Sequence, residues 1–202
     1  SPLVEQMEID SSIAAVQPKI MSAQNPEVFD YAGGVGGLID ILAFPYALGR
    51  IFTTTEKDDG YYDIPRDIFW ASGTALLIRG AALQDVGLFD EDFFAHMEEI
   101  DLCWRFHNAG WRVVNAPKSR IFHHSGWTLP PDRYQKKYLN HRNNLMMIIK
   151  NYPFAYLAAI FPARLVLEGV AFVFSALIRD WKRMAAITMA IGWNLFHPFL
   201  LI

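Results

Sequence analysis

Several features that would assign a function directly are scarce in this chain of 202 residues. It has a single cysteine, Cys103, so no disulfide can form within the chain, and this suits a reducing cytoplasm. We interpret Cys103 as a small buried residue beside Trp104 rather than a nucleophile, because a reactive thiol needs an exposed, electropositive setting. The net charge is −3 with no basic excess, which argues against nucleic acid as a partner.

Motifs that bind nucleotide phosphates are also missing. The glycines within residues 33–37 are followed by neither Gly-Lys-Ser/Thr nor a predicted helix, so a tight turn is a better interpretation than a phosphate loop. The only Asp-x-Asp sequence, residues 90–92, is interpreted as the start of a helix with Asp90 as its N-cap. No signal peptide is recognisable at the first residue, Ser1, and we expect the chain to be a fragment of a longer protein.

The residues that are present alternate between strand-like and helix-like patterns. Helices are expected over 3–9, 80–86, 91–109 and 132–151, and strands over 13–21, 69–79, 111–115 and 120–124, the last two joined by a turn at Pro117. Residues 29–52 are interpreted as a glycine-rich connector and residues 53–67 as an exposed loop. This alternation favours an α/β fold with a mixed sheet.

Three carboxylates, Glu98, Glu99 and Asp101, lie on the predicted helix 91–109. Residues three or four apart share a helix face, so Glu98 neighbours Asp101, and Asp101 can form a structural ion pair with Arg105. Glu99 points about 100° away from Glu98. An acid that lies near other acids and is screened from water has a raised pKa, which brings it toward the range useful to a general base.

A histidine pair, His123 and His124, follows this helix two predicted strands later. Because side chains alternate along a strand, only one of the two is expected to face a cleft. A lone histidine is more often structural, but acids near a helix start with imidazoles two strands later are what a metal-assisted group transfer would need. A metal-dependent hydrolase is one alternative that uses the same residues, although no His-Glu-x-x-His spacing supports it.

Residues 89–126, FDEDFFAHMEEIDLCWRFHNAGWRVVNAPKSRIFHHSG, resemble the acceptor half of family 2 glycosyltransferases of the GT-A fold. The resemblance extends over about residues 1–150 and is most specific between 70 and 145. It implies a partial GT-A domain over residues 1–151, rhamnosyltransferase-like in character. The implied activity is inverting transfer of a sugar from a nucleotide-diphospho-sugar to a glycan or lipid-linked acceptor, in polysaccharide or cell-wall biosynthesis.

The resemblance also implies roles for the acids and histidines. The general base of these enzymes is the second acid of a Glu-Asp pair, which maps to Glu99, where this chain has Glu in place of the usual Asp. Glu98 occupies the preceding position and would orient the acceptor. His123 maps to a ligand of the divalent metal, Mn²⁺ or Mg²⁺, that holds the donor diphosphate, and His124 is the adjacent candidate.

Five further residues are assigned to acceptor or phosphate binding. Arg142 lies in NHRNNL, which resembles a recurrent Arg-Asn element, and its guanidinium suits a phosphate, although a helix-surface cation is an equal alternative. Trp70, Gly73 and Thr74 lie where the acceptor-side strand of the family runs, and Asp101 lies beside the acids.

Enzymes of this family also need an N-terminal nucleotide-binding unit that ends in Asp-x-Asp. We expect this unit upstream of the chain, and we therefore expect that the chain alone transfers no sugar. A second alternative function is a non-catalytic, membrane-associated scaffold in which residues 98–101 form a solvated face.

Residues 152–202 are expected to form an apolar, membrane-associated helical segment at the cytoplasmic face of the cell membrane, peripheral or integral. Residues 154–178 are apolar except for a narrow stripe in which Arg164 and Glu168 can pair. A crossing would place the basic residues of 179–183 outside, so an in-plane helix is favoured, with a span that could begin near residue 184. An ordinary soluble helical bundle is the alternative.

Overall fold

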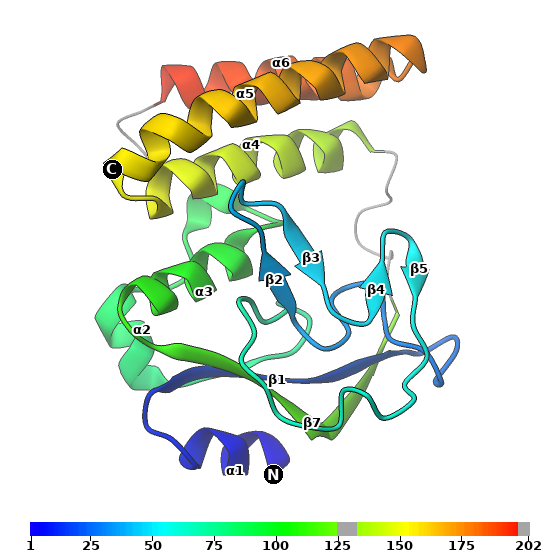
Figure 1. Cartoon of the computed structure of the whole chain (residues 1–202), viewed down its shortest axis with the longest axis vertical. Helices are drawn as coiled ribbons and strands as arrows, with labels where there is room; N and C mark the ends of the chain where they lie inside the picture. The colour runs from blue at the N-terminus through cyan, green and yellow to red at the C-terminus, as the bar shows by residue number, and fades with distance from the viewer. Residues whose placement is uncertain (125–132, 198–202) are drawn as a thin grey trace. The chain divides into compact units, whose positions relative to one another are not determined.

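The computed structural model describes residues 1–124 and 133–197, which Figure 1 shows as ribbons. Contacts between residues divide the chain into two compact units. Unit 1 comprises residues 1–40, 45–90 and 99–125, and unit 2 comprises residues 41–44, 91–98 and 126–202. These units are defined by contacts and do not test the predicted domains 1–151 and 152–202, which stay a prediction.

A three-stranded mixed sheet organises unit 1, as the sequence predicts. Its central strand β1 (Ile13–Ser22) pairs in parallel with β7 (Arg112–His123) and antiparallel with β6 (Leu77–Ile78). Helix α1 (Pro2–Glu8) packs against β1 and β7 through an apolar cluster of Met7, Ile13, Val16, Val114 and Ala116. The predicted helix 3–9 and strand 13–21 are therefore confirmed.

Strand β7 is one continuous strand, so the prediction of two strands joined by a turn at Pro117 is wrong. Pro18 of β1 pairs with Ala116, and the next residue, Lys19, pairs with Arg120. Residues 117–119 thus form an irregularity that the sheet accommodates as a bulge. A bulge tolerates proline because its missing N–H is not needed for the ladder.

The predicted strand 69–79 is mostly absent. Only β6 and a single bridge from Trp70 to Gly37 belong to regular pairing. The chain turns between them, where the Ala75 N–H donates to the Ser72 carbonyl at 3.2 Å. Helix α2 (Gly80–Val86) follows as predicted.

The glycine-rich connector forms a tight turn and two small hairpins. The N–H of Gly36 donates to the Gly33 carbonyl at 2.9 Å, and the two glycines have φ values of +94° and +105°. A Cβ on Gly37 would lie 2.0 Å from the Trp70 ring, so no side chain fits there. The hairpins pair β2 (Gly37–Ile39) with β3 (Pro45–Ala47) and β4 (Arg50–Ile51) with β5 (Thr54–Thr55). The tight turn predicted for residues 33–37 is confirmed. The predicted exposed loop over 53–67 also contains the short strand β5.

Helix α3 (Glu98–Asn108) begins later than the predicted residue 91. A 3-10 turn, η1 (Glu91–Phe93), comes first, so Asp90 does not cap α3. Between the two, Phe94, His96 and Met97 have positive φ values of 61°, 70° and 74°. Such a backbone is unfavourable for residues other than glycine, and it excludes a continuous helix.

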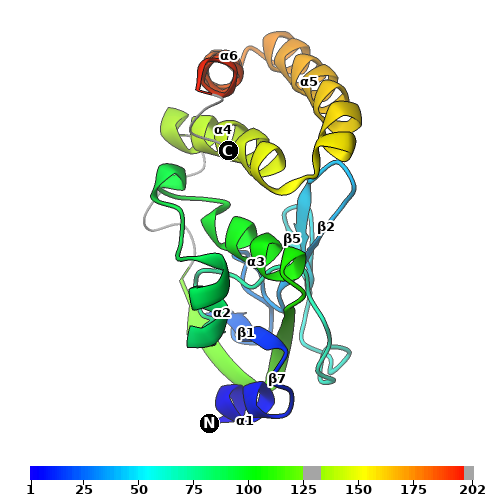
Figure 2. The same cartoon turned by 90° about the vertical axis from the view of Figure 1, so that its left-hand side faces the viewer.

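Unit 2 contains the helices α4 (Tyr134–Asn151), α5 (Phe154–Leu177) and α6 (Trp181–Phe196), which Figure 2 shows from a second side. Both α5 and α6 pack on α4, and they also contact each other. The Asp180 side chain caps α6 by accepting from the Arg183 N–H at 3.0 Å. The predicted helices 132–151 and 154–178 are confirmed. The span that could begin near 184 includes residues 198–202, which lie outside the described residues.

Candidate active site

The acids of α3 occupy different surroundings within its first turn. Asp101 is fully buried, and its Oδ2 accepts from the Arg105 Nε at 2.9 Å, which confirms the expected ion pair. Arg105 also donates to the carbonyls of Val86 and Leu88 at 2.7 and 2.9 Å. Asp101 therefore helps to fix α3 against the end of α2, and its assignment to acceptor or phosphate binding stays a prediction.

Glu98 and Glu99 are both partly buried. Burial raises the pKa of the Glu98 carboxyl. A Cβ on Gly73 would lie 3.8 Å from the Glu99 Cβ, so the turn that contains Gly73 borders Glu99. Thr74 helps to shape this turn, since its N–H donates to the Ser72 Oγ at 3.2 Å. The predicted acceptor-side residues Gly73 and Thr74 thus lie next to the predicted base.

The Arg-Asn element of α4 holds the segment that precedes α3. The Asn143 side-chain amide donates to the carbonyls of Phe93, Ala95 and His96 at 2.9, 2.8 and 2.7 Å. The Arg142 guanidinium donates to the carbonyls of Asp92 and Phe93 at 2.6 and 3.1 Å. These bonds compensate the unfavourable backbone before α3. They give Arg142 a structural role, and phosphate binding by Arg142 stays a prediction.

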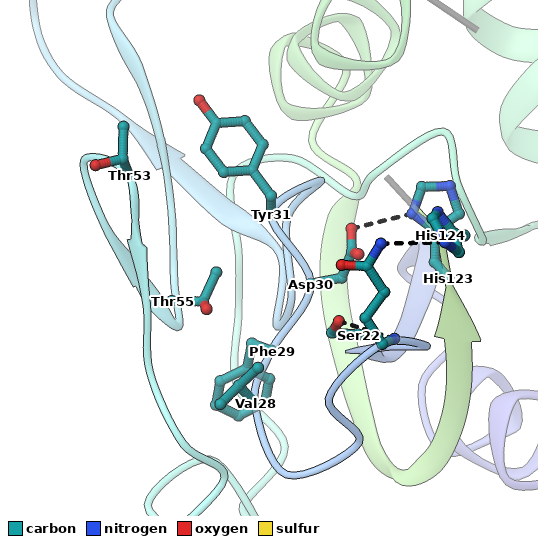
Figure 3. A pocket seen from close by; sticks show the side chains of 10 residues that line it. Ser22, Val28, Phe29, Asp30, Tyr31, Thr53, Thr55, His123 and His124 are labelled. Atoms are coloured by element: carbon teal, nitrogen blue, oxygen red, sulfur yellow. Dashed lines mark hydrogen bonds and ion pairs between the residues drawn. The ribbon is translucent and has the colours of Figure 1, made fainter. Parts of the chain in front are cut away.

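A cavity of about 200 Å³ lies where β1 and β7 end, in unit 1 (Figure 3). Its wall includes the polar residues Asp30, Tyr31, Thr53, Thr55, His123 and His124. The parallel pairing explains why these residues meet, because Ser22 at the end of β1 lies opposite His123 at the end of β7. Residues that follow the two strands are therefore delivered to the same edge of the sheet.

Asp30 fixes the ring of His123. Its Oδ1 lies 3.0 Å from the His123 Nδ1, and the carboxylate is 3% exposed. The N–H of Ala32 donates to the same oxygen at 2.8 Å, which orients the carboxylate. An Nδ1–H that donates to a carboxylate directs Nε2 toward a second role, as in histidines that bind metals.

His124 lines the same cavity, and its Nε2 lies 3.1 Å from the Gln24 Nε2. The prediction that only one of the two histidines would face the cleft is wrong. Strand β7 ends at His123, so His124 is not bound by the alternation of a strand.

Glu99 is not among the described residues that line this cavity, but a short series of contacts connects the two. The Ser72 Oγ donates to the Ala32 carbonyl at 2.6 Å, which joins the turn beside Glu99 to the loop that carries Asp30. The prediction that Glu99 and His123 line one common hollow stays a prediction.

The cavity offers some of the ligands that a divalent metal needs. The His123 imidazole is a donor that Mn²⁺ accepts, and the Asp30 carboxylate orients it. Within residues 1–124 and 133–197, no group of three His, Cys, Asp or Glu residues is arranged to hold an ion. Because Mg²⁺ and Mn²⁺ commonly keep waters and phosphate oxygens as ligands, this partial set fits such a metal.

Cys103 and Trp70 are structural. Cys103 is fully buried, as predicted, and burial raises the pKa of its thiol to about 12. Trp70 is 7% exposed, packs on the glycine turn and donates from its indole N–H to the Leu38 carbonyl at 3.1 Å. Binding of an acceptor by Trp70 stays a prediction.

Most of this chain matches one known protein family. Residues 47–201 match the sequence profile of Glycosyl transferase family group 2. The chain belongs to this family. The resemblance inferred from residues 89–126 is thereby confirmed.

Similar family 2 proteins include two rhamnosyltransferases. The N-acetylglucosaminyl-diphospho-decaprenol L-rhamnosyltransferase of Mycobacterium tuberculosis (strain CDC 1551 / Oshkosh) is 30% identical over 113 residues, which cover 56% of this chain and 36% of the relative. Rhamnosyltransferase WbbL of Escherichia coli (strain K12) is 32% identical over 80 residues, or 40% of this chain and 30% of the relative. The chain thus spans about a third of the length of these relatives.

A solved structure establishes the fold of this family 2 chain. The crystal structure of GalNAc-T7 with UDP, GalNAc and Mn²⁺ aligns with 99% of this chain and 38% of that protein, with a TM-score of 0.56. The sequence identity is 15%, so this likeness concerns the fold alone. The predicted partial GT-A fold, followed by apolar helices, is confirmed.

Most of the residues that line the cavity of this family 2 chain were missed by sequence reasoning, among them Asp30, Tyr31, Thr53 and Thr55. They lie in segments that were interpreted as connector and loop. Asp30 and His123 are 93 residues apart, so no spacing rule relates them. The parallel pairing of 13–22 with 112–123 is the signal that would have brought them together.

Proposed function

We propose that this chain forms the acceptor side of an inverting glycosyltransferase that moves a sugar from a nucleotide-diphospho-sugar to a hydroxyl of a glycan or lipid-linked acceptor. The observation that carries the proposal is the partly buried Glu99 at the start of α3, bordered by the open Gly73 turn, in a chain of glycosyltransferase family 2. The name of the mycobacterial relative, a rhamnosyltransferase with a decaprenol-linked substrate, supports a role in polysaccharide or cell-wall synthesis.

In this mechanism Glu99 is the general base. Its carboxylate takes the proton from the acceptor hydroxyl while that oxygen forms a bond to the anomeric carbon. The bond from the anomeric carbon to the diphosphate breaks on the opposite face, so the configuration inverts. Glu98 orients the acceptor, and burial raises the pKa of its carboxyl. Positioned acids and bases of this kind typically contribute about 10²–10⁴-fold in rate.

His123 holds the metal side of the proposed site. Its Nε2 would serve as a ligand of Mn²⁺ or Mg²⁺ because Asp30 holds Nδ1. A divalent ion bound there would neutralise the charge that develops on the departing nucleoside diphosphate. His124, with Gln24 beside it, is the adjacent candidate for contact with the diphosphate.

The chain contains no Asp-x-Asp other than residues 90–92, and Glu91–Phe93 form the 3-10 turn η1. We therefore propose that this chain alone transfers no sugar. We also propose that the enzyme works at the cytoplasmic face of the cell membrane, where a lipid-linked acceptor would be found.

The test is transfer activity of the full-length gene product with nucleotide sugars and a lipid-linked acceptor. Glu99→Gln should lower kcat by about 10²-fold or more, because the base is removed while the shape is kept. Glu8→Gln, which changes an exposed acid of α1, is the matched control and should leave kcat unchanged. Full activity of Glu99→Gln would contradict the proposal and favour a scaffold. Release of nucleoside diphosphate that needs no acceptor would favour the hydrolase.

A further inference from the structure

Helix α5 is polar on its buried side and apolar on its exposed side. Arg164 and Glu168 are 1% and 4% exposed, and Ser175 continues the same buried stripe two turns later. The exposed side carries an apolar stripe that we call the α5 apolar face; its members are Val166, Val170, Val173, Phe174 and Leu177, which are between 52% and 77% exposed. Residues two apart on a helix point about 200° away from each other, so Val166 lies opposite Arg164.

The buried charges have partners inside unit 2. The Arg164 guanidinium donates to the Leu42 carbonyl at 2.8 Å, lies 3.7 Å from the centre of the Phe44 ring and pairs with Glu168 at 3.3 Å. The other Glu168 oxygen lies 2.6 Å from the His141 Nδ1. A helix at the surface of a protein in water has the opposite arrangement, with apolar residues inside. An apolar medium therefore suits the α5 apolar face better than water does.

We propose that the α5 apolar face docks on the surface of a lipid bilayer with α5 lying in the plane of the interface. This inference rests on the membrane location in the proposed function and names the surface of the chain that contacts the membrane. Basic residues follow directly at Arg179, Lys182 and Arg183, and Trp181 between them is 63% exposed. Cations of this kind are attracted to anionic headgroups, and tryptophan prefers the headgroup level.

An orientation across the bilayer is disfavoured by the partners of α5. The helix has 24 residues and is long and apolar enough to cross a bilayer. However, its middle is bonded to α4 through Glu168 and His141. Helix α4 carries His141, Arg142 and Asn143 in its middle, and a crossing α5 would bring them into the hydrocarbon at high cost. An in-plane helix buries only its apolar face, to a depth of about 5–10 Å.

The test is cosedimentation of the purified chain with vesicles of phosphatidylcholine and phosphatidylglycerol. Val170→Asp should lower the partition coefficient by about tenfold or more, because a charge would replace an exposed valine of the face that enters the bilayer. Ile64→Asp is the matched control, since Ile64 lies in unit 1, is 72% exposed and should tolerate the change without loss of binding. Lys182→Gln should weaken binding to these vesicles but not to vesicles of phosphatidylcholine alone. Circular dichroism verifies that each variant keeps its helix content.

The depth of α5 is measured separately with a nitroxide attached at Val166→Cys or Val173→Cys, because Cys103 is fully buried. Similar shallow depths at both positions support the in-plane helix, and a label at the bilayer centre overturns it. Docking is also overturned if the wild-type chain does not bind vesicles or if Ile64→Asp loses binding as Val170→Asp does. A dimer without lipid that Val170→Asp dissociates would assign the face to a second copy of the chain. No sugar transfer is measured, so failure here leaves the proposed transfer reaction untouched.

Discussion

Two arginines, Arg112 of unit 1 and Arg164 of unit 2, lie in opposite surroundings. In unit 1, Arg112 is at the surface, where its 44%-exposed side chain pairs with Asp10 and Asp67. In unit 2, Arg164 is buried on α5 and valines occupy the outer face. The contrast teaches that the exposed face of an element indicates the medium around it. Arg112 lies where water can reach it, whereas α5 buries its charges and exposes valines.

The two units share one requirement, which is that a buried charge has partners. Lys19 of β1 is 1% exposed, and its ammonium lies 2.6 Å from Asp58 and 2.5 Å from Asp63. Arg164 has Glu168, a carbonyl and an aromatic ring. An unpaired charge in either position would be strongly destabilising.

The largest expected effect is the loss of stability when the buried arginine, Arg164, is removed. Arg164→Ala should lower the free energy of unfolding by about 3 kcal/mol, because the buried Glu168 would lose its arginine and keep only His141 as a partner. Arg112→Ala removes an arginine with two carboxylate partners at the surface and should cost about 1 kcal/mol or less. Urea unfolding of the purified chain measures both. Equal losses would show that α5 and the sheet of unit 1 do not differ in the way described.

A second, smaller effect concerns the polar cavity of unit 1. Asp30→Asn should weaken Mn²⁺ binding by the full-length gene product by about 10- to 100-fold, because the ring of His123 loses its anionic partner. Electron paramagnetic resonance of free Mn²⁺ measures the affinity without any need for turnover. Asp85→Asn, at an exposed acid that accepts from the Trp111 indole, is the control and should have no effect. Unchanged affinity in Asp30→Asn would mean that Asp30 does not position a metal ligand.

The sequence predicts those elements whose pattern is local. Strand β1 and helices α4 and α5 follow their apolar periodicity, and the Asp101–Arg105 and Arg164–Glu168 pairs follow from residues four apart on a helix. The acids of α3 and the His123–His124 pair could be singled out in the same way, since the family motif is contiguous.

Features that depend on distant partners could not be predicted. The late start of α3 depends on the Asn143 amide, which bonds to carbonyls 47 to 50 residues earlier in the chain. Asp30 belongs to the site only because β1 and β7 pair in parallel. The strand expected over 69–79 is interrupted by a turn at Ser72, whose N–H donates to the Gln17 side chain and whose Oγ donates to the Ala32 carbonyl. In each case a tertiary contact overrides a reasonable local interpretation.

The smallest expected effect concerns Glu98, where burial raises the pKa of the carboxyl above its value in the unfolded chain. Stability that depends on the protonated form is fully present below the unfolded pKa and is lost as the pH rises through the folded pKa. Wild type should therefore lose stability relative to Glu98→Gln as the pH rises from about 4 toward neutrality, since the unfolded pKa of glutamate is about 4.3. Urea unfolding at a series of pH values measures the difference.

Glu91→Gln changes an exposed acid of the preceding 3-10 turn and should show no such pH-dependent difference from wild type. If wild type instead gains stability over Glu98→Gln as the pH rises, the Glu98 carboxylate has a stabilising partner in the folded chain. Its carboxyl would then be ionised at neutral pH, and it could not donate a hydrogen bond to an acceptor. The acid pair at the start of α3 would in that case provide two bases, unlike the division of roles proposed for Glu98 and Glu99.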